Sequence, residues 1–422
     1  MKYFNINIST ANPSSNTDKY LINSLFVILV FLFINPIYAI LLTTYFSINH
    51  SYSKSISLLI LILSFSLFFF NRKYDVNFYF DSTDDVPVYI DYYLKLNSLS
   101  ISDIFANFLQ SPSGNEPFWH LIWWFVNRAT NSNVDIFLFL HYLLIFYFFA
   151  KISISLSPKF FEILFLLILF LFPVTLYNAC HLWRQILSFE FFLFGSLLYY
   201  QKNNKTLGFI YIILSVLTHV SSLYFFAIFI SYNIYLRLIT NLTKKNIVIF
   251  SSIILILISF SFKILLSILG ETFDRLASYT EGASADRQGI GLKLAFYIAI
   301  TLYAFIKSKI TNFNVFLFIN IIVPLFLPFL FPTLNSIYDR YFSLALTLLS
   351  LYLFIISTNV FNNIIYIREK LLFFFIFILL IISISKLYFE FSNGIGVISF
   401  IGSSNAFKIN NGIFDLLFKQ IN

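Results

Sequence analysis

The chain has 422 residues, of which 59% are hydrophobic and only 11% are charged. A soluble protein of this length could not bury that much apolar surface in one core. The net charge of +8 is spread over short loops, which is typical of signals that orient a membrane protein and not of a nucleic-acid-binding surface. Composition therefore predicts a membrane protein and excludes a nucleic-acid partner.

The cysteine and histidine content argues against a metal centre. The one cysteine, Cys180, has no second cysteine with which to form an intramolecular disulfide. None of the five histidines lies in an HxxxH or HExxH spacing. We predict that the protein has no metal site and no cofactor.

Apolar runs long enough to cross a bilayer recur along the chain, since about 20 apolar helical residues span a hydrocarbon core about 30 Å thick. They lie at 20–45, 54–71, 134–151, 160–177, 184–200, 206–237, 246–269, 293–308, 312–331, 338–358 and 370–390. The pattern predicts an all-α polytopic integral membrane protein with about 11–12 transmembrane helices. We expect a single transmembrane domain over residues 1–422.

The lysines and arginines of short loops predict which loops are cytoplasmic. Five connections are doubly basic: Lys151 with Lys159, Lys202 with Lys205, Lys244 with Lys245, Lys307 with Lys309, and Arg368 with Lys370. If these are cytoplasmic, the connections 178–183, 270–292 and 332–337 lie outside. Two basic loops flank the single run 206–237, so we expect this run to form two helices. They would turn at LTHVSS and place His219 near the outer face.

Two longer external segments follow from this orientation. Segment 72–133 is the longest polar stretch, and it ends in WHLIWWFVNR, which is too short to cross a bilayer. We predict a short interfacial helix there, with Trp119, Trp123 and Trp124 at headgroup depth. Segment 270–292 is expected to be a second external loop.

Arginines gather where the predicted spans end on the outer side. Arg184 and Gln185 open one span in YNACHLWRQIL, and Arg340 opens another. Arg275 and Arg287 lie in the loop ETFDRLASYTEGASADRQGIGLK. Arginine within a membrane usually faces a water-filled cavity or a paired charge. Guanidinium groups bind phosphate oxygens through paired hydrogen bonds, so the set predicts a binding site for pyrophosphate.

Each arginine also has a simpler interpretation. Arg184 could extend its head group to the membrane surface. The others could pair with a neighbouring carboxylate: Arg275 with Asp274 or Glu271, Arg287 with Asp286, and Arg340 with Asp339.

Candidates for proton transfer lie on the same side. His219 has an unperturbed pKa of about 6.5, which suits proton transfer at neutral pH, although a lone histidine is more often a hydrogen-bonded structural residue. Asp85 and Glu116 could activate a sugar hydroxyl or could be solvated loop charges. Glu116 precedes Pro117, and a residue before proline leaves helical geometry, so we expect Glu116 immediately before the interfacial helix.

Five short motifs occur in an order that is typical of one family. They are Asp85, Tyr89 and Tyr93 in DVPVYIDYY; Glu116, Pro117 and Phe118 in NEPFW; Arg184 with Gln185; Thr218, His219, Ser221 and Ser222 in THVSS; and Arg340, Tyr341 and Phe342 in DRYF. This order, over about residues 55–350, resembles the EpsG family of membrane polysaccharide polymerases, which are related in role to the Wzy O-antigen polymerases. The family often has an arginine and a glycine shortly before the aspartate, whereas here Arg72 lies farther upstream and YFDST replaces the glycine.

The resemblance implies a glycosyltransferase of the bacterial inner membrane with a periplasmic active face. It would polymerise lipid-linked repeat units into O-antigen, capsule or exopolysaccharide by transfer from undecaprenyl pyrophosphate. Its partners would be the undecaprenyl-pyrophosphate-linked glycan and the lipid bilayer, with a chain-length regulator and a flippase as candidate protein partners.

Residue roles follow from combining the motifs with the outer-face set. The residues assigned to the lipid pyrophosphates are Arg184, Arg287, Arg340 and, as a further candidate, Arg275. The candidate proton acceptors are His219, Asp85 and Glu116, and the supporting residues are Tyr89, Gln185 and Ser222.

Two rival interpretations stay open on sequence alone. The first is another enzyme of the same lipid carrier: an O-antigen ligase, or a polyprenyl-phosphate-dependent membrane glycosyltransferase, which the acidic first external segment would fit. The second is a polysaccharide flippase or transporter, which would bury charges near the middle of spans and often shows repeat symmetry.

Overall fold

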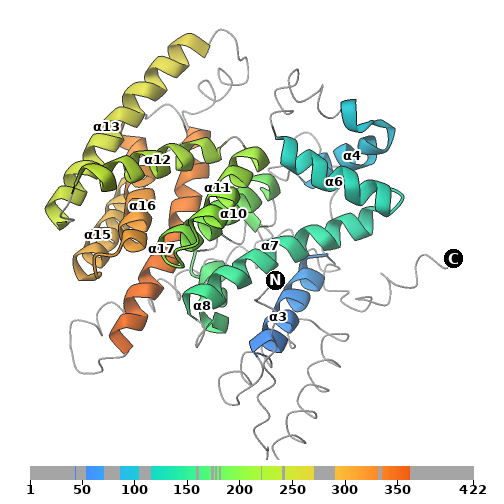
Figure 1. The fold of residues 1–422 in the computed structure, drawn as a ribbon, viewed down its shortest axis with the longest axis horizontal. Coiled ribbons are helices and arrows are strands. Elements are labelled where there is room, and N and C mark those ends of the chain that lie inside the picture. Colours follow the sequence, from blue (N-terminus) through green and yellow to red (C-terminus); the bar gives the residue numbers. More distant parts are fainter. Residues whose placement is uncertain are drawn as a thin grey trace, which may run out of the picture.

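A computed structural model gives the structure of residues 43, 54–70, 86–103, 116–157, 161–172, 175, 178–179, 182–219, 221–239, 243–269, 290–330 and 335–361. Every regular element in these residues is helical (Figure 1). The first half of the chain contributes α3 (Lys54–Phe70), α4 (Val86–Lys95), the 3-10 turn η2 (Leu96–Ser98), α6 (Pro117–Ala129), α7 (Val134–Leu156), α8 (Phe161–Phe170) and α10 (Trp183–Tyr200). The second half contributes α11 (Lys205–Thr218), α12 (Ser222–Leu238), α13 (Lys244–Leu269), α15 (Ile290–Lys307), α16 (Asn312–Leu330) and α17 (Asn335–Phe361).

The helices follow the apolar runs closely, which confirms the all-α prediction. The run 206–237 does divide into two helices, α11 and α12, and His219 is the residue that ends α11. The expected runs at 20–45, apart from Thr43, and at 370–390 lie outside the described residues, as do residues 270–289 of the expected second external loop. Helix α8 ends before Pro173, whereas α16 continues through Pro324 and Pro328.

Helices α6 and α7 are joined by a tight turn that polar side chains define. Asn131 and Ser132 adopt positive φ angles of 51° and 61°, a conformation that asparagine tolerates better than most residues. Asn133 then caps α7, because its side chain accepts a hydrogen bond from the Ile136 N–H at 2.9 Å. The turn lays α6 and, with it, α4 against the first half of α7 (Figure 1).

Helices α10 and α11 form the centre of the bundle and pack unusually closely. A Cβ atom added to Gly195 would lie 2.7 Å from the Gly208 carbonyl oxygen, and one added to Gly208 would lie 2.7 Å from that of Gly195. Only glycine fits this crossing, as at other close helix contacts between membrane segments. The crossing fixes the positions of both helices, and therefore of the residues at the start of α10 and at the end of α11.

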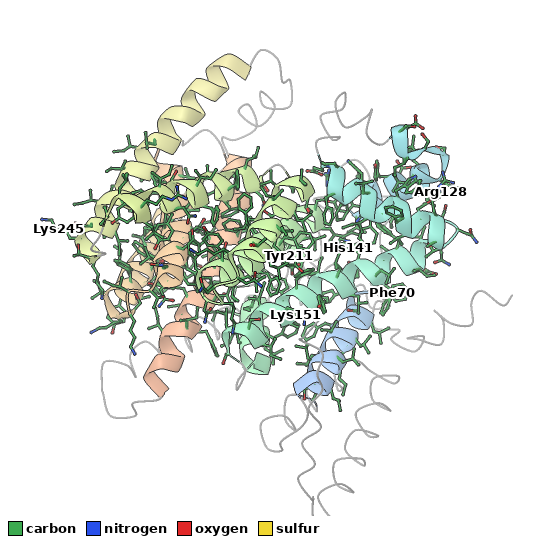
Figure 2. All side chains as sticks on the ribbon, viewed as in Figure 1. Phe70, Arg128, His141, Lys151, Tyr211 and Lys245 are labelled. Carbon is green, nitrogen blue, oxygen red and sulfur yellow. The ribbon has the colours of Figure 1, made fainter. Side chains whose placement is uncertain are left out.

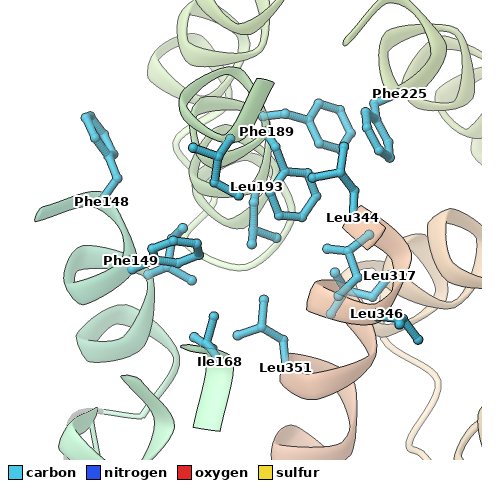
Figure 3. Close-up of a cluster of buried hydrophobic side chains, with 14 of the residues drawn as sticks. Phe148, Phe149, Ile168, Phe189, Leu193, Phe225, Leu317, Leu344, Leu346 and Leu351 are labelled. Carbon is cyan, nitrogen blue, oxygen red and sulfur yellow. The ribbon is translucent and has the colours of Figure 1, made fainter. Parts of the chain in front are cut away.

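The hydrophobic core extends from α7 across α10 to α12, α16 and α17. Figure 3 shows Phe149 of α7, Leu193 of α10 and Leu344 of α17 pointing into one cluster. Phe189 of α10 contacts Phe225 of α12, with ring centroids 5.8 Å apart. Because these side chains come from distant parts of the sequence, the described helices form one packed unit.

Among the described residues, one helix, α7, is both long and apolar enough to cross a membrane, and several shorter helices are apolar. Figure 2 shows Arg128 and Lys245 pointing out from the bundle while His141 lies within it.

A helix, α6, forms where the interfacial helix was predicted, and two of its tryptophans are buried inside the protein. Trp119 and Trp123 are each 2% exposed and contact His141 of α7, with centroids 5.2 Å apart in both cases. Only Trp124 is partly exposed, and its indole N–H donates to the Leu99 carbonyl at 3.0 Å. Their burial has a simple physical reason, because α4, α7 and α11 all pack against α6. The depth of these tryptophans in a membrane stays a prediction.

Candidate functional site

The Glu116 carboxylate lies between an arginine and a histidine that are far from it in sequence. The Arg184 Nη1 donates to Glu116 Oε2 at 2.6 Å. The His219 Nε2 is 3.6 Å from the other carboxylate oxygen, Oε1. The carboxylate side chain is only 7% exposed, while that of Arg184 is 24% exposed. Three of the predicted site residues therefore converge on one group.

Glu116 owes its position to the start of α6. It is the N-cap residue, with φ −131° and ψ 62°, and Pro117 follows as the first helical residue. Proline favours this position because it needs no backbone N–H there, and it keeps the preceding residue out of helical geometry. The Glu116 side chain makes no capping hydrogen bond, so its carboxylate points away from the helix end.

Arg184 lies in the first turn of α10, and its guanidinium packs on the face of an aromatic ring. The guanidinium carbon is 5.3 Å from the centroid of the Tyr89 ring. Tyr89 stacks on Trp183 at 5.4 Å and contacts Trp119 at 5.7 Å. A cation above an aromatic face is stabilised by the ring quadrupole. The Tyr89 ring therefore lies against the Arg184 guanidinium on the α4 side of the Glu116–Arg184 pair.

A hydrogen bond to one ring nitrogen sets the orientation of His219, and the other nitrogen faces Glu116 at 3.6 Å. The backbone N–H of Ser221 donates to Nδ1 at 3.0 Å. Because Nδ1 accepts, we assign the proton of the neutral ring to Nε2, the nitrogen that faces Glu116. The imidazole is therefore arranged to direct an N–H toward the carboxylate.

Tyr341 of the DRYF motif, on α17, contacts the residues that follow His219. Its hydroxyl donates to the Ser221 carbonyl at 3.2 Å, and its ring contacts Tyr224 with centroids 4.5 Å apart. The Arg340 side chain lies outside the described residues. Each of the five sequence motifs nevertheless contributes one residue to this region: Tyr89, Glu116, Arg184, His219 and Tyr341.

The other predicted site residues divide into two groups. Gln185 and Ser222 are buried, and the Ser222 hydroxyl bonds with the Ser188 hydroxyl, so both lie beneath the site. Asp85, Arg275 and Arg287 lie outside the described residues. Within the described part of the chain, no group of three or more histidine, cysteine, aspartate or glutamate residues could hold a metal ion.

Sequence reasoning missed three residues that the structure makes prominent. Tyr92 and His120 border the Glu116–Arg184 pair, with their rings 4.8 Å apart. Glu190 is fully buried within α10, and its carboxylate oxygens have no hydrogen-bond partner among the residues that the structure describes. A single glutamate inside the apolar run 184–200 was the available signal for Glu190. No sequence signal distinguished Tyr92 from the many other tyrosines.

Comparison with known proteins agrees with the motifs. The EpsG family pattern matches residues 76–400, which is most of the chain and includes every residue of the cluster. The chain belongs to the EpsG family. The family is linked to exopolysaccharide biosynthesis. No curated protein and no solved structure matches the chain.

Proposed function

We propose that this EpsG protein polymerises lipid-linked oligosaccharide repeat units by glycosyl transfer from undecaprenyl pyrophosphate at the outer face of the bacterial inner membrane. The observation that carries the proposal is the Glu116 carboxylate between Arg184 and His219. The arrangement supplies a proton acceptor beside a cation that can bind phosphate oxygens. Family membership supplies the link to polysaccharide synthesis.

A multi-pass membrane location is part of the proposal, and the exposed side chains support it. Large apolar residues point outward along helices of the second half, including Ile234 of α12, Ile256 of α13 and Ile306 of α15. Exposed apolar surface on this scale is costly in water and normal in lipid. The site residues lie at helix ends, where a membrane protein meets water.

The proposed reaction uses the Glu116 carboxylate as the proton acceptor. A sugar hydroxyl of the acceptor unit attacks the anomeric carbon of the glycan on the donor lipid. The new C–O bond forms as the bond to the pyrophosphate oxygen breaks, and the hydroxyl proton passes to Glu116. The products are the longer lipid-linked glycan, undecaprenyl pyrophosphate and a protonated Glu116, which later releases its proton to water.

Glu116 is a better proton acceptor than His219 in this arrangement. The Ser221 N–H occupies Nδ1 of the imidazole, and the Nε2 proton faces Glu116. His219 therefore positions the carboxylate. This interpretation selects one of the three acceptors that the sequence left open.

Arg184 links the proton transfer to the departure of the pyrophosphate. While Glu116 is ionised, it neutralises the guanidinium at 2.6 Å. Once Glu116 takes the proton, Arg184 loses the countercharge of Glu116, and its guanidinium can stabilise the negative charge on the leaving group. A 24% exposed side chain on an aromatic support can reach such a group without repacking the core.

Purified protein in vesicles with lipid-linked repeat units tests this proposal. We expect wild-type protein to lengthen the glycan and release undecaprenyl pyrophosphate in equal amounts, and Arg184→Ala to do neither. The control is Arg128→Ala, because Arg128 is an exposed α6 residue that bonds the Leu99 carbonyl away from the cluster. Lengthening by Arg184→Ala at the wild-type rate would contradict the mechanism.

A second function, transport of the lipid-linked glycan, is favoured by one specific observation. Glu190 and His141 are fully buried in α10 and α7, and their polar atoms have no partner among the described residues. Ionisable residues inside membrane helices often mark a transport path. If the protein is a transporter, Glu190→Gln will stop translocation of the lipid-linked unit in vesicles while polymerisation is absent from wild type.

A further inference from the structure

Tyr92 lies beside the Glu116–Arg184 pair but takes no part in it. It is on α4, one turn after Tyr89, and its ring contacts the His120 imidazole with centroids 4.8 Å apart. The backbone N–H of His120 donates to the Glu116 carbonyl at 3.2 Å. The aromatic pair therefore borders the start of α6, where the carboxylate is presented.

The Tyr92 phenol is close enough for the charges of Arg184 and Glu116 to affect its pKa. Burial is the main cause that raises its pKa above the ordinary value, the Arg184 charge lowers the pKa, and the Glu116 charge raises it. The net shift is upward, so the phenol keeps its proton throughout the physiological range. Its hydroxyl is consequently a permanent hydrogen-bond donor at the edge of the site.

This donor is unused in the part of the chain that the structure describes. Tyr92 is partly exposed, and none of the described residues forms a hydrogen bond with its hydroxyl. The next residue, Tyr93, is the opposite case: its side chain is buried and its hydroxyl bonds the Thr130 hydroxyl at 2.8 Å. The Tyr93 hydroxyl links α4 to the α6–α7 turn. The position of Tyr92 is thereby fixed, while its hydroxyl makes no hydrogen bond to a described residue.

We propose that Tyr92 forms the subsite for the acceptor sugar whose hydroxyl attacks the donor glycan, and that His120 positions the Tyr92 ring from behind. The inference rests on the proposed polymerase function and extends it to the recognition of a sugar ring. A pyranose has an apolar C–H face that packs on an aromatic ring and oxygens that accept hydrogen bonds. A rigid aromatic body with one polar tip matches both features.

The test compares Tyr92→Phe with Tyr93→Phe in purified protein supplied with lipid-linked repeat units. Tyr92→Phe keeps the ring and loses only the donor, so we expect the KM for the acceptor to rise about 5- to 10-fold while kcat changes less than about twofold. Tyr93→Phe should lower the unfolding temperature and leave KM unchanged, because its hydroxyl is structural. Tyr92→Ala should raise KM further.

The outcomes separate the subsite from the polymerase function. A wild-type KM for Tyr92→Phe overturns the subsite, even if Tyr92→Ala fails to fold. If wild type does not polymerise, the proposed function fails. The subsite is then decided by titrating tryptophan fluorescence, from Trp119 and its neighbours, with the same lipid-linked unit. Weaker binding by Tyr92→Phe would support the subsite, and equal binding would overturn it.

Discussion

The two charged residues of α10, Arg184 and Glu190, have opposite surroundings. Arg184, in the first turn, has a carboxylate at 2.6 Å and an aromatic ring beneath it. Glu190, less than two turns farther along, is fully buried, and none of the described residues forms a hydrogen bond with either of its carboxylate oxygens. On α7, the His141 ring stacks on Trp183 at 3.9 Å, and its two nitrogens likewise have no hydrogen-bond partner in the part of the chain that the structure describes.

The comparison shows which ionisable side chains of the bundle have charged partners and which do not. At the start of α10, Glu116, Arg184 and His219 contact one another across long sequence distances. In the interior, Glu190 and His141 are fully buried without a hydrogen-bond partner among the described residues, which is energetically unfavourable. The first arrangement fits the proposed proton transfer, and the second is where a gain in stability is most easily obtained.

The largest expected effect is on activity, from Glu116→Gln. The substitution preserves shape but removes the proton acceptor and the charge that neutralises Arg184. We expect polymer synthesis to fall by at least about 100-fold, as is usual when a general base is lost. Chain-length analysis of the polysaccharide measures the effect, with membrane abundance as the control. Retention of more than a tenth of wild-type synthesis would remove Glu116 from the mechanism.

The next effect is on stability, from Glu190→Met compared with Glu116→Met. Replacing the unpartnered Glu190 by an unbranched apolar side chain should raise the free energy of unfolding by about 1–3 kcal/mol. The same replacement at Glu116 should lower it, because a partly buried arginine loses its partner. Thermal unfolding in detergent measures both. If Glu190→Met is less stable than wild type, the Glu190 carboxyl has a stabilising partner or bound ligand outside the described residues.

A smaller effect is expected from His219→Gln. Glutamine can still direct an N–H toward Glu116, but it lacks the second contact with Ser221 that fixes the imidazole. Because the His219–Glu116 separation is already 3.6 Å, we expect kcat to fall only about 3- to 10-fold with KM unchanged. A loss as large as that of Glu116→Gln would instead make His219 the proton acceptor.

The smallest effect is local and depends on pH. Asp103, fully exposed after η2, accepts hydrogen bonds from the Ser100 hydroxyl and backbone N–H, and these bonds lower its pKa below the ordinary 3.8. A lowered pKa means that the ionised form favours the folded turn above the unfolded pKa. That contribution is lost as the pH falls through the folded value. Amide exchange at Ser100 should therefore accelerate only in strong acid, and Asp103→Asn should show the faster exchange at neutral pH.

Much of the fold could be predicted from sequence because apolar runs and helix-ending residues act locally. The division of 206–237 into α11 and α12 followed from two basic loops on either side of one run, and the structure confirms it. The start of α6 after Glu116 followed from Pro117 alone. The packing of Trp119 and Trp123 inside the protein could not be predicted, because it depends on which elements cover α6, and no local pattern carries that information.

The candidate site was predicted as a set of residues but not as an arrangement. Arg184, Glu116 and His219 were identified from their motifs, yet the ion pair between Arg184 and Glu116 was not. Sequence proximity suggested neighbouring carboxylates as partners for the loop residues Arg275 and Arg287 and for Arg340 at the start of a span, and all three side chains lie outside the described residues. Tyr92 could not be distinguished from other tyrosines until its neighbours were known.

The sequence by itself determined that the chain is helical, that it is too apolar for a single soluble core, and which motifs it shares with the EpsG family. Those properties depend on composition and on spacings of a few residues. Only the tertiary structure decided that Glu116 lies beside Arg184 and His219, and that the buried Glu190 carboxylate has no hydrogen-bond partner among the described residues. Such pairings depend on how helices cross, and the Gly195–Gly208 contact shows that a crossing is set by close packing between segments.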